Sequence, residues 1–447
     1  MQLTEGLDLV AETTADDDQE AAAGPAKLFQ VLGPGLITGA SDDDPSGIAT
    51  YSQAGAQFGL DLGWTLFFSW PLMCAIQEIS ARIGRVTGRG LAGNLKRHYP
   101  TPLVLALVSA LLVANTINLG ADLGAMGASL QLIAGGGDAS KGGPELVYVA
   151  VLAAIIVGLE VFLSYQRYAA VLKWLTLSLF AYVAVALVVK TPWAEVGYHL
   201  VVPHISLEAG YLTVVVAVLG TTISPYLFFW QAEEEVEEVK EEPGAEPLIR
   251  APRAAKKEFA RIRLDTYLGM GISNAVALFI VVTTAVTLHA QGVTNIQTSS
   301  DAALALRPIA GQFAFALFAL GIVGCGLLAV PVLAGAAAFA LGEVFGFRVG
   351  LARRPERAKT FYGVIAAACF VGVLLNFIRI DPIKALFWSA VVNGVTAVPI
   401  MAMIMHLGAH RAAMGRFRIP LGLRTVGWLA TAVMAAAAVG MFATLNA

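Results

Sequence analysis

Eleven stretches of this sequence are apolar and long enough to cross a lipid bilayer as helices, because one crossing needs about 20 residues. Charged residues make up only 14% of the chain, against roughly 25% in soluble domains. The pattern predicts an all-α polytopic membrane protein whose spans form one transmembrane domain over 26–445, in contact with the lipid bilayer. The expected spans are 28–58, 62–83, 101–133, 145–164, 168–190, 208–235, 264–289, 309–343, 360–378, 383–406 and 425–445.

The Lys and Arg residues are divided unequally between the loops. With the N-terminus placed in the cytoplasm, 23 of them fall in the loops after spans two, four, six, eight and ten, against 5 in the other loops. Loops that stay in the cytoplasm carry such an excess of basic residues. We therefore expect a plasma-membrane protein with a cytoplasmic N-terminus and an external C-terminus.

Two polar segments lie outside the apolar stretches. Residues 1–25 are acidic and alanine-rich and contain no basic start followed by an apolar core, which indicates a disordered cytoplasmic tail rather than a signal peptide. Residues 236–262 form a predicted charged cytoplasmic loop. We interpret the acidic run at its start, "EEEVEEVKEEPG", as a solvated helix end and linker, and a metal-sensing patch is the alternative.

Two of the spans contain helix-breaking residues near their middle. In the first span, "SDDDPSG" places Pro45 and Gly47 directly after three aspartates. In the sixth span, Gly220 and Pro225 bracket "TTIS". Proline lacks a backbone N–H and glycine tolerates unusual dihedral angles, so both helices should unwind at these points.

The two interrupted spans occupy corresponding places in the two halves of the chain. Such a pair is typical of membrane proteins built from two inverted repeats, with a binding site at the bilayer midplane where the breaks meet. We expect two inverted five-helix repeats, over about 28–190 and 208–406, followed by an extra helix at 425–445.

Oxygen atoms gather at the two breaks. Unwound backbone must line a cavity and has free carbonyl groups, and a carboxylate inside a membrane is expected to bind a cation. Asp44 directly precedes the proline, so we assign it as an anionic metal ligand, with the Thr221 carbonyl, the Ser224 hydroxyl and water completing an oxygen shell. Asp42 and Asp43 either line the path of the ion or are only wetted there. The alternative is that the three aspartates solvate a kink and bind nothing.

At these residues the chain resembles the NRAMP family of divalent metal transporters. The stretch "DPSGIATYSQAGAQFG" (44–59) is similar to the family's D-P-G-N motif and the sequence that follows it. The stretch "EISARIGRVTGRGLAGNL" (78–95) has the family's Ala-Arg-x-Gly-x-Val-Thr-Gly pattern, and "NTINLGADLGAMG" and "GTTISPY" can be placed as well. The resemblance implies a LeuT-type fold with broken helices one and six.

The resemblance also implies which residues hold the metal, and where this chain departs from the family. The family's aspartate ligand falls on Asp44 and its carbonyl ligand on Thr221. Its amide residue in the first motif is Gly47 here, its sixth-span methionine is Ser224, and its histidine is Tyr226. Loss of the soft thioether favours hard cations, and smaller side chains suit a hydrated ion. The chain therefore resembles the NRAMP-related magnesium transporters, and the expected cargo is Mg²⁺ or Mn²⁺.

Polar residues on the third span bear on proton coupling. Asn115, Asn118 and Asp122 share one helical face. The resemblance places Asp122 at an acidic position of the family's proton route, and a helix–helix hydrogen bond is the alternative role. Ala125 and Tyr226 replace titratable residues that the family has along this route. A proton relay needs consecutive titratable groups, so we expect weak or no proton coupling.

The predicted function is uptake of a hard divalent cation by alternating access. The alternatives are a proton-coupled Mn²⁺/Fe²⁺ transporter of the ordinary NRAMP type and an organic-solute carrier of the same fold. The resemblance places Asn393, in the tenth span, beside the ion. The sequence contains neither H-E-x-x-H nor G-x-S-x-G, so we expect no enzyme activity, and we expect no cofactor and no nucleic-acid partner. A monomer is compatible with this sequence.

Overall fold

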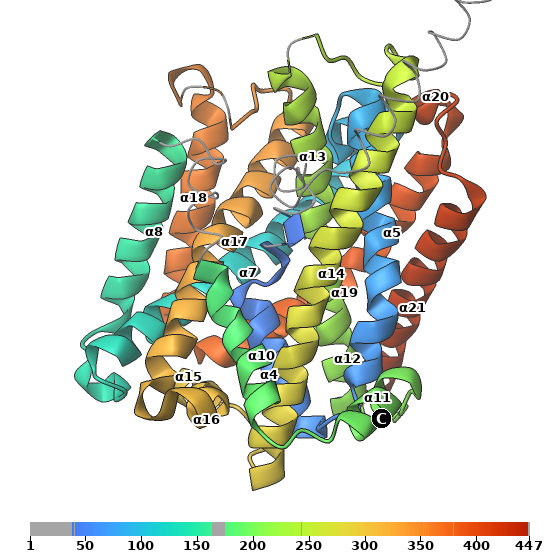
Figure 1. Cartoon of the computed structure of the whole chain (residues 1–447). Helices are drawn as coiled ribbons and strands as arrows, with labels where there is room; N and C mark the ends of the chain where they lie inside the picture. The colour runs from blue at the N-terminus through green and yellow to red at the C-terminus, as the bar shows by residue number, and fades with distance from the viewer. Residues whose placement is uncertain are drawn as a thin grey trace, which may run out of the picture.

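The structure is a computed structural model, and it describes residues 38–39, 41–162, 175–242, 244–351, 353, 355–378 and 380–445. The tail predicted at 1–25 lies outside these residues, as do the beginnings of the first and fifth predicted spans. Every regular element in the described part of the chain is helical (Figure 1). The predicted all-α class is confirmed.

The long helices follow the predicted spans. The largest departures lie at the end of the sixth span and the start of the seventh, where the helices run on beyond the apolar residues. The helices within the predicted spans are α4 Pro45–Phe58, α5 Gly63–Thr87, α7 Thr101–Ala134, α8 Glu145–Phe162, α10 Phe180–Val188, α12 Ala209–Thr222, α13 Pro225–Glu241, α14 Ala255–Thr287, α17 Ala314–Phe345, α18 Lys359–Leu375, α19 Pro382–Ala409 and α21 Leu421–Leu445.

Several of these helices can cross a membrane by themselves. In the described part of the chain, 8 helical stretches are long and apolar enough, or 9 if the bent pair Leu177–Val188 and Trp193–Val201 is one span. Helix α5 has 25 residues, but Gln77, Glu78 and Arg85 make its second half polar. The polytopic architecture is confirmed.

Short helices that the sequence analysis did not identify lie at the two ends of the bundle. Helices α11, α15 and α16 lie at the end that holds the C-terminus, and α20 lies at the opposite end (Figure 1). They are too short to give a clear periodic pattern. Their bounds are α6 Leu91–His98, α11 Trp193–Val201, α15 Ser299–Ala303, α16 Arg307–Ala310 and α20 Arg411–Met414.

Both predicted breaks are present, and they have the same local geometry. Asp44 is the N-cap of α4 and Ser224 is the N-cap of α13, and each is extended and followed by proline. Steric conflict with the proline ring forces the preceding residue out of the helical region, and proline then fits the first helical position. The X-Pro pair therefore ends one helical segment and begins the next.

The breaks are enclosed by protein. Helix α4 packs against α12, α14 and α19, and α7 packs against α17 and α19. Almost every residue of α12 is buried, as are the first twelve residues of α4 apart from Gln53. Irregular backbone at membrane depth is tolerated only in such surroundings, because lipid offers no hydrogen-bond partner.

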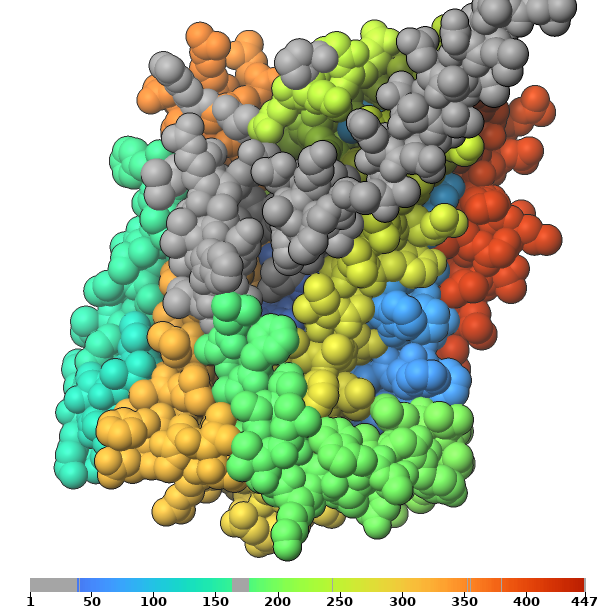
Figure 2. All heavy atoms as spheres, viewed as in Figure 1, coloured from blue at the N-terminus to red at the C-terminus, as the bar shows by residue number. Residues whose placement is uncertain are grey.

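The outer helices present apolar side chains outwards. Val147, Val151 and Ile155 of α8 recur every four residues and are all exposed, and Phe162 is exposed as well. Helix α8 forms the left margin of the molecule in Figure 2, while α10 and α11 cover the lower part of the same face. A stripe of exposed valine, isoleucine and phenylalanine suits acyl chains rather than water, which supports the predicted contact with the bilayer.

The acidic run after the sixth span is not a solvated helix end, so that interpretation was wrong. Helix α13 continues to Glu241, and Glu233, Glu234 and Glu235 are buried within it. Arg261 of α14 pairs with Glu235 at 2.6 Å and with Glu238 at 2.7 Å. These ion pairs compensate part of the negative charge, and they allow both helices to extend into the segment predicted as a loop at 236–262.

Close packing at Gly220 yields a stability prediction. A Cβ atom there would collide with backbone atoms of Ala390 and Gly394 in α19, whereas a Cβ at Gly158 of α8 would meet nothing within 4 Å. We expect Gly220→Ala to lower the free energy of unfolding by about 1–3 kcal/mol through overpacking. Gly158→Ala should be neutral or slightly stabilising. Thermal unfolding of both purified variants is the measurement, and equal midpoints would contradict the packing argument.

Candidate metal-binding site

The Asp44 carboxylate is fixed at the start of α4. It is 2% exposed. Its Oδ1 accepts hydrogen bonds from the Gly47 backbone N–H at 2.7 Å and from the Ser46 hydroxyl at 2.7 Å. A carboxylate at an N-cap is stabilised by the free N–H groups of the first helical turn. The local sequence D-P-S-G therefore both breaks the span and holds the aspartate in one orientation.

The second oxygen of Asp44 faces two other helices. Asn118 of α7 donates a hydrogen bond from Nδ2 to Asp44 Oδ2 at 2.9 Å. The Tyr226 hydroxyl in α13 lies 3.5 Å from the same oxygen and 3.2 Å from the Ser41 carbonyl oxygen. The tyrosine contact with Asp44 is at the long limit of a hydrogen bond. Oδ2 can therefore bind a cation with a smaller loss of hydrogen-bond energy than Oδ1.

Gly47 brings the two breaks close together. A Cβ atom at this position would lie 3.1 Å from the Thr221 hydroxyl, 3.2 Å from the Tyr51 ring and 3.4 Å from Asp44 Oδ1. The end of α12 can approach α4 because position 47 has no side chain. We expected glycine to leave room for a hydrated ion, but in this conformation Thr221 and Tyr51 occupy that space.

The oxygen atoms predicted on the sixth span are hydrogen-bonded to each other. The Ser224 hydroxyl lies 2.9 Å from the Thr221 carbonyl oxygen and 2.8 Å from the Gly220 carbonyl oxygen, and it donates its proton to them. A hydroxyl that donates still keeps its acceptor lone pairs. Ser224 therefore satisfies carbonyl groups that the break has freed, and its oxygen remains able to contact a cation.

Asp42 and Asp43 are directed to a different helix from Asp44. The hydroxyl of Ser273 in α14 lies 2.6 Å from Asp42 Oδ2 and 3.1 Å from Asp43 Oδ1. Both aspartates are buried, and Asp42 Oδ1 has no hydrogen-bond partner within the described residues. The structure thus places these two carboxylates beside α14 and does not join them to the Asp44 contacts.

Asp122 and Asn393 are fully buried, and neither bonds to a side chain in the described part of the chain. The backbone N–H of Ser46 interacts with the Asp122 carboxylate. Asp122 follows Asn118 by one turn on α7, and Asn393 follows Ser389 by one turn on α19. The Ser389 hydroxyl donates to Asn118 Oδ1 at 2.6 Å. Asp122 and Asn393 therefore each lie one helical turn beyond a residue that is hydrogen-bonded, directly or through Asn118, to Asp44. An unpaired buried carboxylate is costly, and in a membrane it indicates a functional role.

Asn118 and Ser389 were not among the predicted site residues. Asn118 contacts the carboxylate directly, and Ser389 orients its amide. The polar face of the third span, with Asn118 one turn before Asp122, was the signal that could have found Asn118. The sequence around Ser389 shows no comparable pattern.

The site contains one carboxylate and several neutral oxygen atoms. In the part of the chain that the structure describes, no group of three His, Cys, Asp or Glu side chains is arranged to hold a metal ion. A resident metal is usually held by a fuller set of charged ligands, whereas a transported ion must also leave. One buried carboxylate beside two broken helices fits transient binding of a cation.

Comparison with solved structures shows the fold. A manganese transporter from Eremococcus coleocola, in complex with an aromatic bis-isothiourea substituted compound, superposes with a TM-score of 0.65 at 15% identity, covering 93% of this chain and 87% of that one. Mhp1, a nucleobase-cation-symport-1 family transporter, gives a TM-score of 0.54 at 14% identity, with 93% of each chain covered. The chain has the LeuT-type fold of multi-pass membrane transporters.

Sequence comparison gives the family. Divalent metal cation transporters MntH from Burkholderia ambifaria and Klebsiella pneumoniae strain 342 are 26% and 27% identical to this chain. The alignments cover 92% and 95% of this chain and 88% and 96% of the relatives. The family model for natural resistance-associated macrophage protein-like sequences matches residues 35–444. The chain belongs to the Nramp family.

The hydrogen bond from Asn118 gives a prediction for the site. We expect Asn118→Ala to lower metal flux at sub-saturating metal about tenfold or more, because a hydrogen bond to a charged group contributes about 1.5–3 kcal/mol. Asn115→Ala is the matched control, since Asn115 is a buried amide on the same helix that donates to the Leu333 carbonyl instead. Flux per folded protein in proteoliposomes is the measurement. Equal losses in the two variants would show that the Asn118 contact has no special role.

Proposed function

We propose that this protein takes up a hard divalent cation, Mg²⁺ or Mn²⁺, by alternating access with weak or no proton coupling. The observation that carries the proposal is the position of the Asp44 carboxylate. It lies at the break of the first span, beside Tyr226 of α13 and across Gly47 from the Thr221 hydroxyl. The names of the MntH relatives and of the Eremococcus coleocola protein support metal transport in general.

The donor atoms support a preference for hard cations. The side chains that meet Asp44, those of Ser46, Asn118 and Tyr226, offer oxygen atoms and an amide. The position where the family has a methionine holds Ser224. Carboxylate, carbonyl, hydroxyl and water ligands suit Mg²⁺ and Mn²⁺, while sulfur ligands suit softer metals. Mg²⁺ keeps several water molecules when it binds, so one carboxylate with neutral oxygens is a sufficient protein contribution.

The arrangement of the breaks supports alternating access. Asp44 contacts residues from both halves of the chain, because Asn118 belongs to the first predicted repeat and Tyr226 to the second. Rocking of one repeat against the other can therefore open the site to either side in turn. The distribution of basic loops favours a cytoplasmic N-terminus in the plasma membrane. A divalent cation entering a cell at −100 mV gains about 4.6 kcal/mol, so uptake needs no second ion.

The residues along the family's proton route bear on the choice between the proposed mechanism and a second candidate. Ala125 follows it by one turn, and Tyr226 stands at the histidine position of the family, so a chain of titratable groups is interrupted. The buried carboxylate of Asp122, which bonds to no side chain among the described residues, nevertheless favours a second candidate function, proton-coupled transport of Mn²⁺ or Fe²⁺. Transport of an organic solute is disfavoured, because the site is anionic and the family is Nramp.

Removal of the Asp44 charge tests the proposed function. We expect Asp44→Asn to abolish Mg²⁺ and Mn²⁺ flux into proteoliposomes, since the side chain keeps its shape but loses the charge that binds the ion. Asp138→Asn should transport like the wild type, because Asp138 is an exposed aspartate that bonds to Ser140 in a loop. Flux of Mg²⁺, Mn²⁺, Ca²⁺ and Fe²⁺ is compared across the three proteins. Persistent flux in Asp44→Asn would overturn the site, and exclusion of Mg²⁺ by the wild type would overturn the ion preference.

Asp122→Asn separates the two candidate mechanisms. Under the proposed mechanism the wild type carries metal without matching acidification, and Asp122→Asn keeps most of the flux. Internal pH and metal influx are recorded together in proteoliposomes. Acidification that follows metal influx in the wild type and disappears in Asp122→Asn would instead support the proton-coupled candidate.

A further inference from the structure

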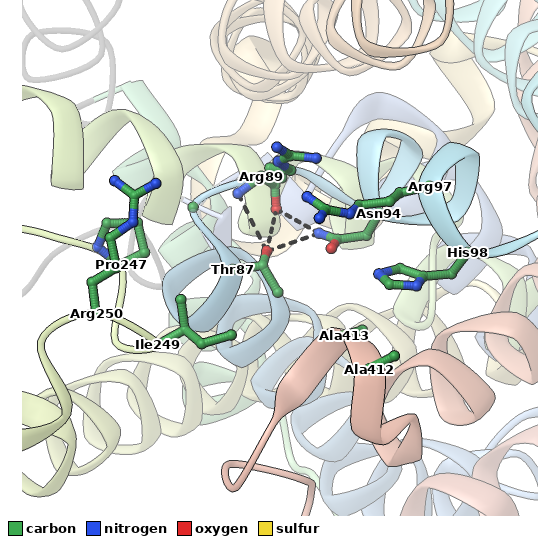
Figure 3. A pocket seen from close by; sticks show the side chains of 11 residues that line it. Thr87, Arg89, Asn94, Arg97, His98, Pro247, Ile249, Arg250, Ala412 and Ala413 are labelled. Carbon is green, nitrogen blue, oxygen red and sulfur yellow. Dashed lines mark hydrogen bonds between the residues drawn. The ribbon is translucent and has the colours of Figure 1, made fainter.

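A cavity of about 440 Å³ lies at the end of the bundle that holds α20, far from the broken helices along α5. Three separate segments form it: the turn and helix from Thr87 to His98, the connection between α13 and α14, and α20 (Figure 3). Arg89 and Arg97 come from the first segment and Arg250 from the second. The loop charges place this end of the molecule in the cytoplasm.

Within the described residues, no carboxylate forms an ion pair with any of the three arginines. Arg82, Arg85 and Arg261 on neighbouring helices are each paired with a glutamate. The ion pairs within the described residues include none for Arg89, Arg97 or Arg250. The carboxylate of Glu343 lines an adjoining cavity with Arg89 and Arg97. Its oxygens are occupied by the backbone N–H groups of Gly90 and Gly93, at 2.8 and 2.7 Å.

The backbone around the cavity is fixed by hydrogen bonds. Asn94 donates from Nδ2 to the Thr87 hydroxyl at 2.8 Å and to the Arg89 carbonyl at 2.9 Å, and the dashed lines in Figure 3 mark this network. On the other side, the N–H of Ile249 bonds to the Val86 carbonyl at 3.1 Å. The segments that carry Arg89 and Arg250 are therefore both tied to the end of α5. Backbone segments that are held in place before binding lose less entropy when a ligand arrives.

The pKa of His98 is affected by the positive charge in this cavity. Partial burial, together with the charges of His410, Arg97 and Arg89, holds the pKa of His98 below its ordinary value. The neighbouring positive charges thus favour the neutral form of this imidazole. The same field attracts an anion that enters the cavity.

We propose that this cavity binds a phosphate-bearing anion, either a phospholipid headgroup or a soluble polyphosphate, through Arg89, Arg97 and Arg250. Guanidinium groups bind phosphate oxygens in bidentate fashion, and here they come from segments far apart in the sequence. The positive-inside pattern requires basic residues in cytoplasmic loops, but it does not require them to converge on one cavity. A bound phosphate would link the end of α5, α6 and the α13–α14 connection, and so fix their relative positions.

The test uses the full-length purified protein in metal-free buffer. In one arm, pyrophosphate is added to the protein in detergent and compared with chloride at equal ionic strength. In the other arm, nanodiscs of phosphatidylglycerol are compared with nanodiscs of phosphatidylcholine. The wild type should show a higher midpoint of thermal unfolding in at least one arm. Arg97→Gln and Arg250→Gln should each weaken apparent binding about tenfold or more, since each removes charge-assisted hydrogen bonds.

Arg357→Gln is the matched control, because Arg357 is an exposed arginine between α17 and α18 that does not line the cavity. It should respond like the wild type. A response to pyrophosphate identifies a soluble ligand, a response to phosphatidylglycerol alone identifies a headgroup, and both support the site. No response in either arm, or an equal response in Arg97→Gln, overturns the proposal.

A second measurement does not depend on the folding of the variants. Phenylglyoxal modifies accessible arginines, and peptide mapping of the wild type reports the extent at each position. Pyrophosphate or phosphatidylglycerol should protect Arg97 and Arg250 several-fold while leaving Arg357 unprotected. Equal modification of all three arginines with and without the anion would also overturn the proposal.

Discussion

A carboxylate buried at membrane depth must be stabilised by its surroundings, and the rest of this structure is arranged around that requirement at Asp44. The start of α4 supplies the Gly47 N–H and the Ser46 hydroxyl, and two other helices supply Asn118 and Tyr226. These donors are all neutral, so they stabilise the charge without cancelling it. The site keeps a net negative charge, which a neighbouring arginine would have removed. In the proposed function, this residual charge is what attracts the cation.

The fold was largely predictable because its strongest signals are local. Twenty apolar residues in succession have few alternatives in a membrane protein, and proline forces the residue before it into an extended conformation. Both ends of α7, the start of α8 and both breaks were therefore found from sequence. The continuation of α13 through its glutamates was not, because it depends on Arg261 from another helix. A run of acidic residues looks solvated until the partners that bury it are known.

The central carboxylate of the site, that of Asp44, was predictable from the sequence, but only some of the residues around it were. Asp44 and Thr221 follow from the breaks themselves. Ser389 could not be found, since its role is to hold the Asn118 amide and nothing near it in the sequence indicates that partner. The space at Gly47 was misjudged for the same reason, because a small residue can open a cavity or let two helices approach. Which of these happens depends on the opposing surface, here Thr221 and Tyr51.

Helix α13 connects the two ends of this arrangement. It begins beside the site at Pro225, and its far end is held to α14 through the pairs of Arg261 with Glu235 and Glu238. Arg85 of α5 reaches the same region through Glu258 at 2.8 Å. A helix with intact internal hydrogen bonds moves as a unit, so a shift at the break near Tyr226 must either carry these ion pairs with it or break them. Separating a buried ion pair leaves uncompensated charges and costs free energy. The ion pairs therefore favour discrete positions of α13 over a continuous range of positions. Alternating access requires discrete states of this kind, and the buried glutamates of α13 thereby gain a role that solvated residues could not have.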